Sequence, residues 1–109
     1  MNAAGLTFVL SGVSAVLGMP DFQSLVTEGN VHQDEFDGTR SQLSAAIATL
    51  KNTPPEKIEA MVAQYDEELT SYLDKFNTKT HEHALDSFRN AQIMIGYVTT
   101  IMTKSDLRE

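Results

Sequence analysis

The sequence contains no cysteine. Without a thiol the chain forms no disulfide, and it offers no thiolate metal ligand, cysteine nucleophile or lipid-modified cysteine anchor. The redox state of its compartment is left open by this absence.

Basic residues are also scarce. The 109 residues include 8 Lys and Arg against 15 Asp and Glu, a formal net charge of −7. Nucleic acids are bound through phosphate contacts with Lys and Arg, and no basic patch with interleaved aromatic residues occurs here, so we expect no nucleic-acid binding. Acidic residues cluster at 34–37 and 66–68. Such clusters form a solvated face or contact a basic partner protein.

Motifs for catalysis are missing. No G-x-S-x-G elbow surrounds a serine, and Gly5, Gly12 and Gly18 are too far apart for a phosphate loop. The carboxylates of 66–68 fall on a polar helix face, where nothing marks an enclosed site that would shift a pKa. We therefore expect a protein that is not an enzyme and has no catalytic or cofactor-binding residue.

One histidine pair is a weak candidate for a metal site. His81 and His83 are two residues apart. Metal ligands on one helix are three or four residues apart, so that both side chains point the same way. We expect exposed histidines at a helix start and no metal, with a metal- or ligand-binding bundle as the weaker alternative.

The N-terminal segment is uncharged. Residues 3–19 are small or apolar, but three glycines and several hydroxyl residues dilute the run, and no Lys or Arg precedes it. A transmembrane helix usually needs ~20 apolar residues. Two interpretations stay open. The segment is a retained remnant of a targeting sequence, or it is a helix that lies on the bundle or in a partner's groove.

Three long amphipathic helices are predicted downstream, near 34–51, from Pro54 or Pro55 to about Phe76, and from about 79 to 103. A short helix at 22–27 and a connector at 28–36 precede them, and Thr53 is the expected N-cap of the second long helix. The prediction is an all-α, up-and-down bundle of three long helices plus an N-terminal helical segment. We divide the chain into 1–30, the apolar segment with its connector, and 31–109, the bundle domain. Three helices leave an open side, which the N-terminal segment or a partner must cover.

The last helix is the most apolar. Its predicted buried stripe is Ala84, Leu85, Phe88, Ala91, Gln92, Ile95, Val98 and Ile101. Gln92 is the polar member of this stripe. It either hydrogen-bonds a neighbouring helix or contacts a partner at an interface. Arg89 lies at the edge of the stripe, from which it could extend to Asp86 or to an acidic partner.

One pattern in the sequence resembles that of a known family. It consists of Tyr72-Leu73-x-x-Phe76, a polar link, and then Leu85-x-Ser87-Phe88. With Thr39-Arg40 and the Pro54-Pro55 link upstream, it resembles the small lumenal photosystem II assembly and repair factors, over residues 36–102. The family's proline-led fourth helix has no counterpart, and the chain carries extra N-terminal sequence instead. Other extrinsic lumenal helix bundles of photosystem II are similar alternatives.

The resemblance implies a non-enzymatic four-helix protein that supports assembly, repair or stability of photosystem II. Its partners would be core and antenna proteins on the lumenal face, and its location the thylakoid lumen of a chloroplast or cyanobacterium. It would be peripheral to the thylakoid membrane, held through the complex or through residues 3–19. The matching residues would mainly build the fold, and they are Thr39, Tyr72, Phe76, Leu85, Ser87 and Phe88. Arg89 and Gln92 are the candidate interface residues. The alternative is a stand-alone acidic adaptor, chaperone or immunity-type protein that binds a basic partner.

Overall fold

The computed structural model describes residues 2–79 and 83–104, except the side chains of Leu73 and of residues 75–79. The described part contains five helices and no strand, so the prediction of an all-α helical bundle is confirmed. The helices are α1 (Ala3–Leu17), α2 (Pro20–Thr27), α3 (Gln33–Lys51), α4 (Pro55–Lys79) and α5 (Ala84–Lys104).

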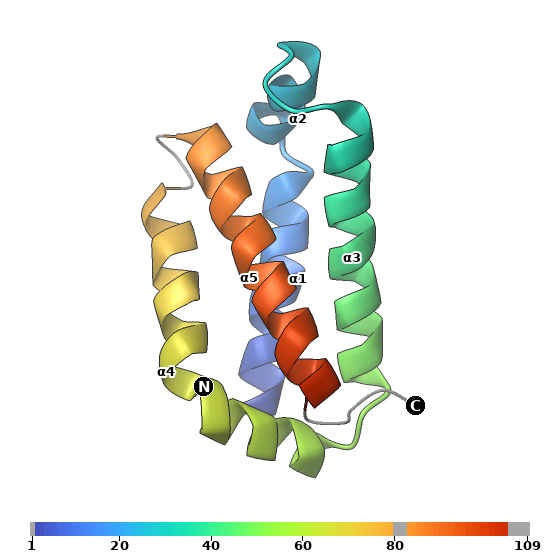
Figure 1. The fold of residues 1–109 in the computed structure, drawn as a ribbon, viewed down its shortest axis with the longest axis vertical. Coiled ribbons are helices and arrows are strands. Elements are labelled where there is room, and N and C mark those ends of the chain that lie inside the picture. Colours follow the sequence, from blue (N-terminus) through green and yellow to red (C-terminus); the bar gives the residue numbers. More distant parts are fainter. Residues whose placement is uncertain (1, 80–82, 105–109) are drawn as a thin grey trace.

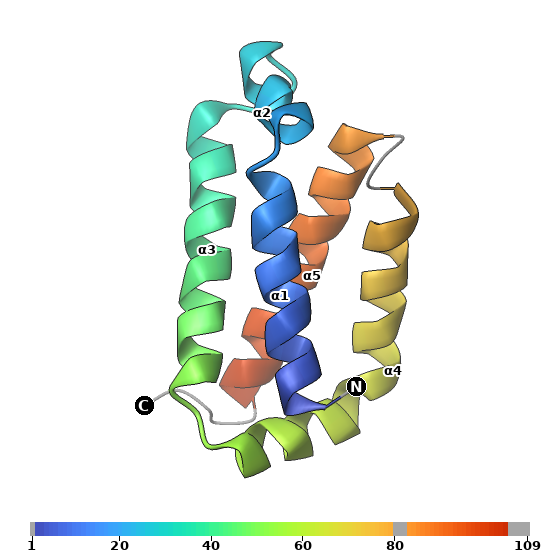
Figure 2. The same ribbon diagram turned by 180° about the vertical axis from the view of Figure 1, so that it is seen from behind.

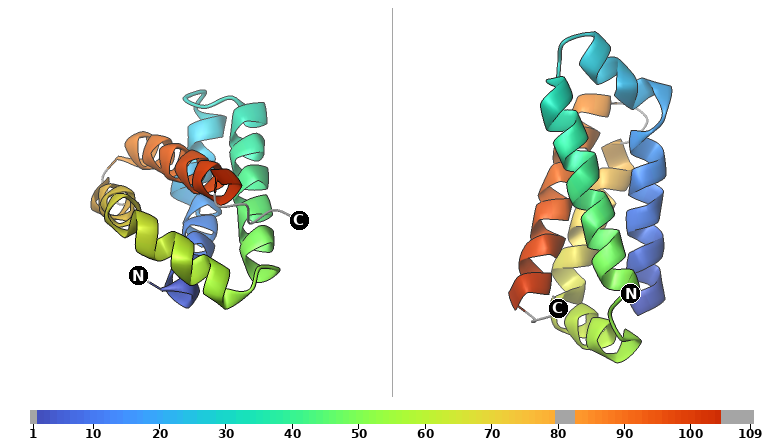
Figure 3. Two further views of the ribbon diagram at one scale, coloured as in Figure 1. Left: turned by 60° about the horizontal axis from the view of Figure 1, so that its bottom comes forward. Right: turned by 90° about the vertical axis from the view of Figure 1, so that its right-hand side faces the viewer.

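The four long helices alternate in direction around one core (Figure 1). In that view α1 and the second half of α4 ascend, whereas α3 and α5 descend. Helix α1 packs against α3 and α4, and α5 packs against the same two helices (Figure 3). Helices α3 and α4 therefore stand at opposite corners, although they follow each other in the sequence. The short α2 covers one end of the bundle and contacts α5 and α1.

Helix α1 fills the side that three helices would leave open. Asn2 caps it, since its side-chain oxygen accepts a hydrogen bond from the backbone nitrogen of Gly5 at 2.7 Å. One stripe of α1 is buried, and its members recur every three or four residues: Ala3, Leu6, Leu10, Val13 and Leu17. The hydrophobic core is continuous across the boundary predicted at residue 30, because this stripe belongs to the same cluster as the buried residues of α3, α4 and α5.

Helix α4 is bent, which the sequence pattern did not predict. Tyr65 has non-helical backbone angles (φ −118°, ψ 18°) in the middle of the helix. The first half crosses the bottom of the bundle and the second half rises beside α5 (Figure 3). The crossing half is fixed under α1, where the Glu59 carboxylate accepts a hydrogen bond from the backbone nitrogen of Ala3. No proline or glycine lies near Tyr65, and the bend lets α4 lead from the end of α3 to the opposite corner of the bundle.

The helix ends differ from the predictions in several places, since α4 ends at Lys79 rather than near Phe76 and α5 begins at Ala84 rather than near residue 79. Thr53 does not stand at the N-cap position of α4, because the first backbone hydrogen bonds of that helix go to the carbonyl oxygen of Pro54. The Thr53 hydroxyl donates instead to the carbonyl oxygen of Thr49 at 2.6 Å, where it satisfies the end of α3. His32 caps the start of α3, with Nδ1 accepting from the backbone nitrogen of Asp34 at 3.2 Å.

The buried stripe of α5 matches the prediction at most positions, and Phe88 is fully buried as expected. Leu85 is the exception, since 38% of its surface is exposed. It lies in the first turn of α5. Near this turn the buried residue is Ser87 rather than Leu85.

Candidate functional site

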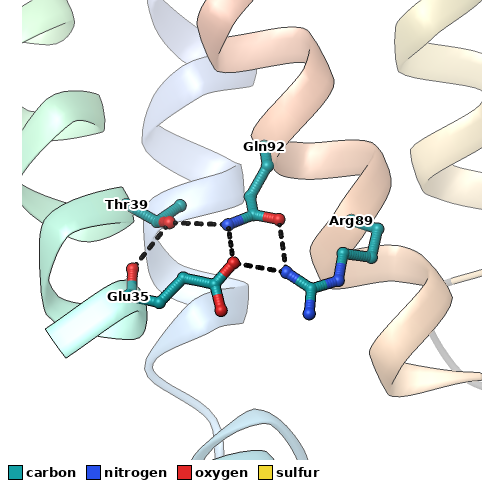
Figure 4. A network of polar contacts seen from close by, with 4 residues as sticks. All are labelled: Glu35, Thr39, Arg89 and Gln92. Carbon is teal, nitrogen blue, oxygen red and sulfur yellow. Dashed lines mark hydrogen bonds and ion pairs between the residues drawn. The ribbon is translucent and has the colours of Figure 1, made fainter. Parts of the chain in front are cut away.

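Four polar side chains from α3 and α5 form a network on the surface of the bundle (Figure 4). Arg89 Nη1 lies 2.5 Å from Glu35 Oε2 and donates a second hydrogen bond to Gln92 Oε1 at 2.9 Å. The Gln92 amide nitrogen in turn donates to Glu35 Oε2 at 3.0 Å and to Thr39 Oγ1 at 3.2 Å. The Thr39 hydroxyl donates to the carbonyl oxygen of Glu35 at 2.9 Å. Each side chain is therefore held by at least two partners.

Local sequence explains why these residues meet. Glu35 and Thr39 are four residues apart on α3, and Arg89 and Gln92 are three apart on α5, so each pair occupies one helix face. Of the two roles open for Gln92, hydrogen bonding to a neighbouring helix is present in the structure. Arg89 pairs with Glu35 instead of Asp86 or a partner. Glu35 was not singled out in the sequence, because nothing there shows that α3 and α5 are adjacent.

The electrostatics of the network favour the charged form of Glu35. Hydrogen bonds from Gln92 and from Arg89 hold the pKa of the Glu35 carboxyl below its ordinary value. The ion pair is still half open to water, with 45% of the Arg89 side chain and 41% of the Glu35 side chain exposed. Ion pairs of this exposure contribute little to stability, so the network chiefly fixes the orientation of its members.

An aromatic stack lies behind the network. Phe36 and Phe88 stack with ring centroids 5.4 Å apart and an interplanar angle of 6°. The guanidinium carbon of Arg89 lies 5.7 Å from the centroid of the Phe88 ring. Contact with a ring face and a carboxylate together limits the freedom of the guanidinium. Arg89 is thus positioned from two sides.

Two exposed aliphatic side chains flank Arg89 on α5. Leu85 precedes it by four residues and Ile93 follows it by four, so all three lie along one side of the helix. Ile93 has 52% of its surface exposed and Leu85 has 38%. We call Leu85, Arg89 and Ile93 the α5 outer stripe. Ile93 was missed in the sequence, although its spacing from Arg89 is a usable signal.

The remaining pattern residues lie apart from this surface. Tyr72 packs against Tyr97, with ring centroids 5.1 Å apart, and Tyr65 meets the same ring edge-on at 6.3 Å. Burial, and then the negative charge of Glu68, raise the pKa of Tyr97 above its ordinary value. Phe76 was expected in the core, but its side chain lies outside the described residues. Tyr72 therefore contributes to the α4–α5 contact.

Ser87 is fully buried, and its hydroxyl has no hydrogen-bond partner among the described residues. Its backbone nitrogen donates to the carbonyl oxygen of His83 at 2.9 Å. A buried, unpaired hydroxyl lowers stability. Thr39 and Phe88 are buried as well, and a mainly structural role for these three positions stays a prediction.

Groups of three or more His, Asp or Glu side chains that could hold a metal do not occur in the part of the chain that the structure describes. His83 is exposed, and His81 lies outside the described residues. A search of the described residues finds no single helix long and apolar enough to cross a membrane. The pair α1 and α2, bent by 54°, meets the length and composition criteria together.

A shallow groove of about 170 Å³ runs between the C-terminal halves of α3 and α5. Its lining residues are small or flexible: Gln42, Ala45, Ala46, Thr49, Thr99, Met102 and Thr103. The hydroxyls of the three threonines donate to backbone carbonyl oxygens of their own helices. The groove therefore presents mostly methyl and methylene groups, with no converging set of polar atoms.

Comparison with known proteins gives no relative, since no family model, no curated protein and no solved structure matches the chain.

Proposed function

We propose that the chain is a non-enzymatic accessory protein that acts by binding another protein through the α5 outer stripe. The observation that carries the proposal is that the exposed Leu85 and Ile93 flank Arg89, whose guanidinium contacts Glu35, Gln92 and the Phe88 ring. Protein interfaces combine apolar anchors with arginine, whose ordering cost is lower when the side chain is already fixed. Gln92 and Glu35 would form the polar border of this contact.

The proposed partner is photosystem II at its lumenal face, where core or antenna proteins would be bound during assembly, repair or stabilisation. The support is the resemblance in the sequence, together with the positions of the matching residues. Thr39 and Phe88 both contribute to the α3–α5 contact that orients Arg89, through Gln92 and through the aromatic stack. The pattern would thus build the fold, and the partner would contact the surface above it.

This proposal places the protein in the thylakoid lumen, peripheral to the membrane and attached through the complex. Helix α1 has its buried stripe in the bundle core. Attachment through the α5 outer stripe would therefore leave α1 in place, and it does not require residues 3–19 to enter the membrane.

Binding to photosystem II particles stripped of their extrinsic proteins tests the proposal, with co-sedimentation as the readout. We expect saturable binding of the wild-type chain and at least a roughly tenfold loss of affinity for Ile93→Asp, because a charge is placed in the apolar part of the contact. Ser44→Asp is the matched control, since it adds the same charge at an exposed position on another helix, α3. The absence of saturable binding, or equal losses for both variants, would refute the proposal.

An adaptor for a basic soluble partner is the second candidate, and the exposed acidic residues Glu28, Asp34 and Asp37 favour it. Binding that depends on exposed charges weakens strongly as salt screens them. Capture of a single soluble basic protein, lost at high salt and insensitive to Ile93→Asp, would support this candidate. It would also count against the α5 outer stripe as the contact.

A further inference from the structure

Helix α1 is uncharged on all sides, and the described residues cover only one of them. It contains no charged residue, and one stripe is buried in the core. Helices that are apolar all round are normally buried all round. Yet α1 lies at the front of the bundle in Figure 2, between α3 and α4, with its other side facing outward. We therefore expect another surface to cover this outer side of α1.

The exposed residues of α1 have the spacing of a helix-pairing seam. Ala4, Phe8, Ser11 and Ala15, followed by the C-cap residue Gly18, are exposed and follow one another at intervals of four, three, four and three residues. This is the spacing with which a helix presents side chains to one partner helix. We call these five residues the α1 outer stripe. A single helix laid along it would meet all of them.

The α1 outer stripe holds one large side chain among small ones. Phe8 is 79% exposed, whereas Ser11, Gly12 and Ala15 leave shallow space one turn further along. A Cβ atom placed on Gly12 would contact nothing within 4 Å beyond its chain neighbours and the backbone of its own helix. A ring from a facing helix fits beside these small residues, as a knob fits a hole. The α1 outer stripe thus contains both a projecting ring, Phe8, and a recess that fits the same ring from an identical helix.

The two ends of α1 carry opposite charges from neighbouring helices. Glu59 of α4 binds the backbone nitrogen of Ala3 at the N-terminal end. Arg40 of α3 reaches the C-terminal end, with Nη2 3.9 Å from the position of a Cβ on Gly18. An identical helix laid antiparallel on α1 brings each negative end next to a positive one. The helix dipoles are then also opposed, which is favourable.

We propose that the α1 outer stripe binds a second copy of this chain in an antiparallel, two-fold symmetric dimer centred near Ser11. Each Phe8 packs against Ser11, Gly12 and Ala15 of the other copy. Two-fold symmetry closes the assembly at two chains, because the same stripe is used on both. The α5 outer stripe belongs to a different helix, so the dimer and the proposed function are independent.

A lipid surface fits the α1 outer stripe less well. Helices that bind membrane surfaces carry Lys and Arg beside their apolar face, and anionic headgroups attract such residues. Here no Lys or Arg precedes Arg40 in the sequence, and the chain carries a net charge of −7. The net negative charge repels anionic headgroups. Two copies of the uncharged α1 outer stripe can meet without charge repulsion at the contact itself.

The expected dimer is weak. One helix face with one aromatic ring per chain buries less than the roughly 800 Å² per partner of a standard interface. The monomer–dimer equilibrium should therefore depend visibly on protein concentration. Sedimentation equilibrium measures it, and we expect Phe8→Ala to raise the dissociation constant by roughly tenfold or more. Ile93→Ala, which truncates another exposed apolar residue, is the control and leaves the constant unchanged.

Single cysteines test the antiparallel register, since the natural chain has none. Ser11→Cys lies near the two-fold axis, so its thiols should form an intermolecular disulfide quickly in mild oxidant. Ala4→Cys lies seven residues from the axis, which separates the two thiols by about 21 Å along the helices. Disulfides require Cα atoms within about 7 Å. Ala4→Cys should therefore cross-link slowly, although it is exposed on the same stripe.

Rapid cross-linking of Ser11→Cys alone, together with a dimer weakened by Phe8→Ala, would support the proposal. A chain that stays monomeric at all concentrations would overturn it. Equal cross-linking of both cysteine variants, or a dimer unaffected by Phe8→Ala, would overturn it as well. Flotation of the monomer with neutral phosphatidylcholine vesicles, lost in Phe8→Ala, would assign the stripe to lipid instead. Unchanged circular dichroism of each variant shows that the fold is intact.

Discussion

Replacing Phe88 by alanine removes a fully buried ring from the contact between α3 and α5. Its exposed fraction is 0%, and its partner in the stack is Phe36, also buried. Truncation of a buried phenylalanine to alanine costs about 3–5 kcal/mol, from lost transfer energy and from the cavity that remains. Part of that cost is the aromatic pair itself, worth about 0.5–1.5 kcal/mol. We expect the free energy of unfolding to fall by roughly 4 kcal/mol.

Urea unfolding followed by circular dichroism measures this loss. With a slope of about 2 kcal/mol per molar urea, the midpoint should fall by roughly 2 M. A domain of this size has a total stability of about 5–15 kcal/mol, so the alanine variant could lack a folded baseline. Phe88→Leu keeps most of the volume and should lose about 1.5 kcal/mol, which remains measurable.

Phe8→Ala is the matched control, because the same atoms are removed from a side chain that is 79% exposed. At low protein concentration its unfolding free energy should stay within about 0.5 kcal/mol of the wild type. A loss below about 1 kcal/mol for Phe88→Ala would contradict burial of this ring, since Phe88 would then face solvent or a partner. Equal losses for the two variants would do the same.

Two further predictions concern the α3–α5 contact. The pKa of Glu35 is lowered in the folded chain, so its stabilising contribution is complete above the ordinary value of 4.5 and is lost as pH falls through the lower folded value. The stability difference between wild type and Glu35→Gln should hence be constant near neutral pH and shrink below pH 4.5. Urea midpoints at several pH values measure this difference. A difference that does not depend on pH would contradict the prediction. Ser87→Ala removes a buried hydroxyl without a partner among the described residues. It should raise the unfolding free energy by about 0.5–1 kcal/mol, because alanine also favours helix. Destabilisation by more than about 1 kcal/mol in the same assay would show that the hydroxyl is bonded.

Helix positions follow from local patterns, and most were therefore predictable. Apolar residues at intervals of three and four predicted α3 and α5 to within a few residues at each end, apart from the later start of α5 at Ala84. The same intervals predicted burial of Phe88, Leu43 and Leu50. The prediction was wrong at Leu85, because a periodic pattern does not show where the core ends relative to the first turn of a helix.

The candidate site was only half visible in the sequence. Arg89 and Gln92 could be singled out, since a polar residue in an apolar stripe needs a partner. Their partner Glu35 could not, because it lies more than fifty residues away, in an acidic cluster that gives no sign of contact with α5. The partner protein stays a prediction that the binding experiments address, and the location in the thylakoid lumen and the lack of enzymatic activity stay predictions.

Residue spacing and composition were enough to predict the long helices, most of their buried positions and the negative charge. Which helices are neighbours became clear from the three-dimensional arrangement alone. It placed α3 and α4 at opposite corners, bent α4 at Tyr65 to connect them, and brought Glu35 against Arg89. It also placed α1 inside the bundle while leaving Phe8 outside. The physical reason is that an apolar stripe requires some cover but does not specify which helix supplies it.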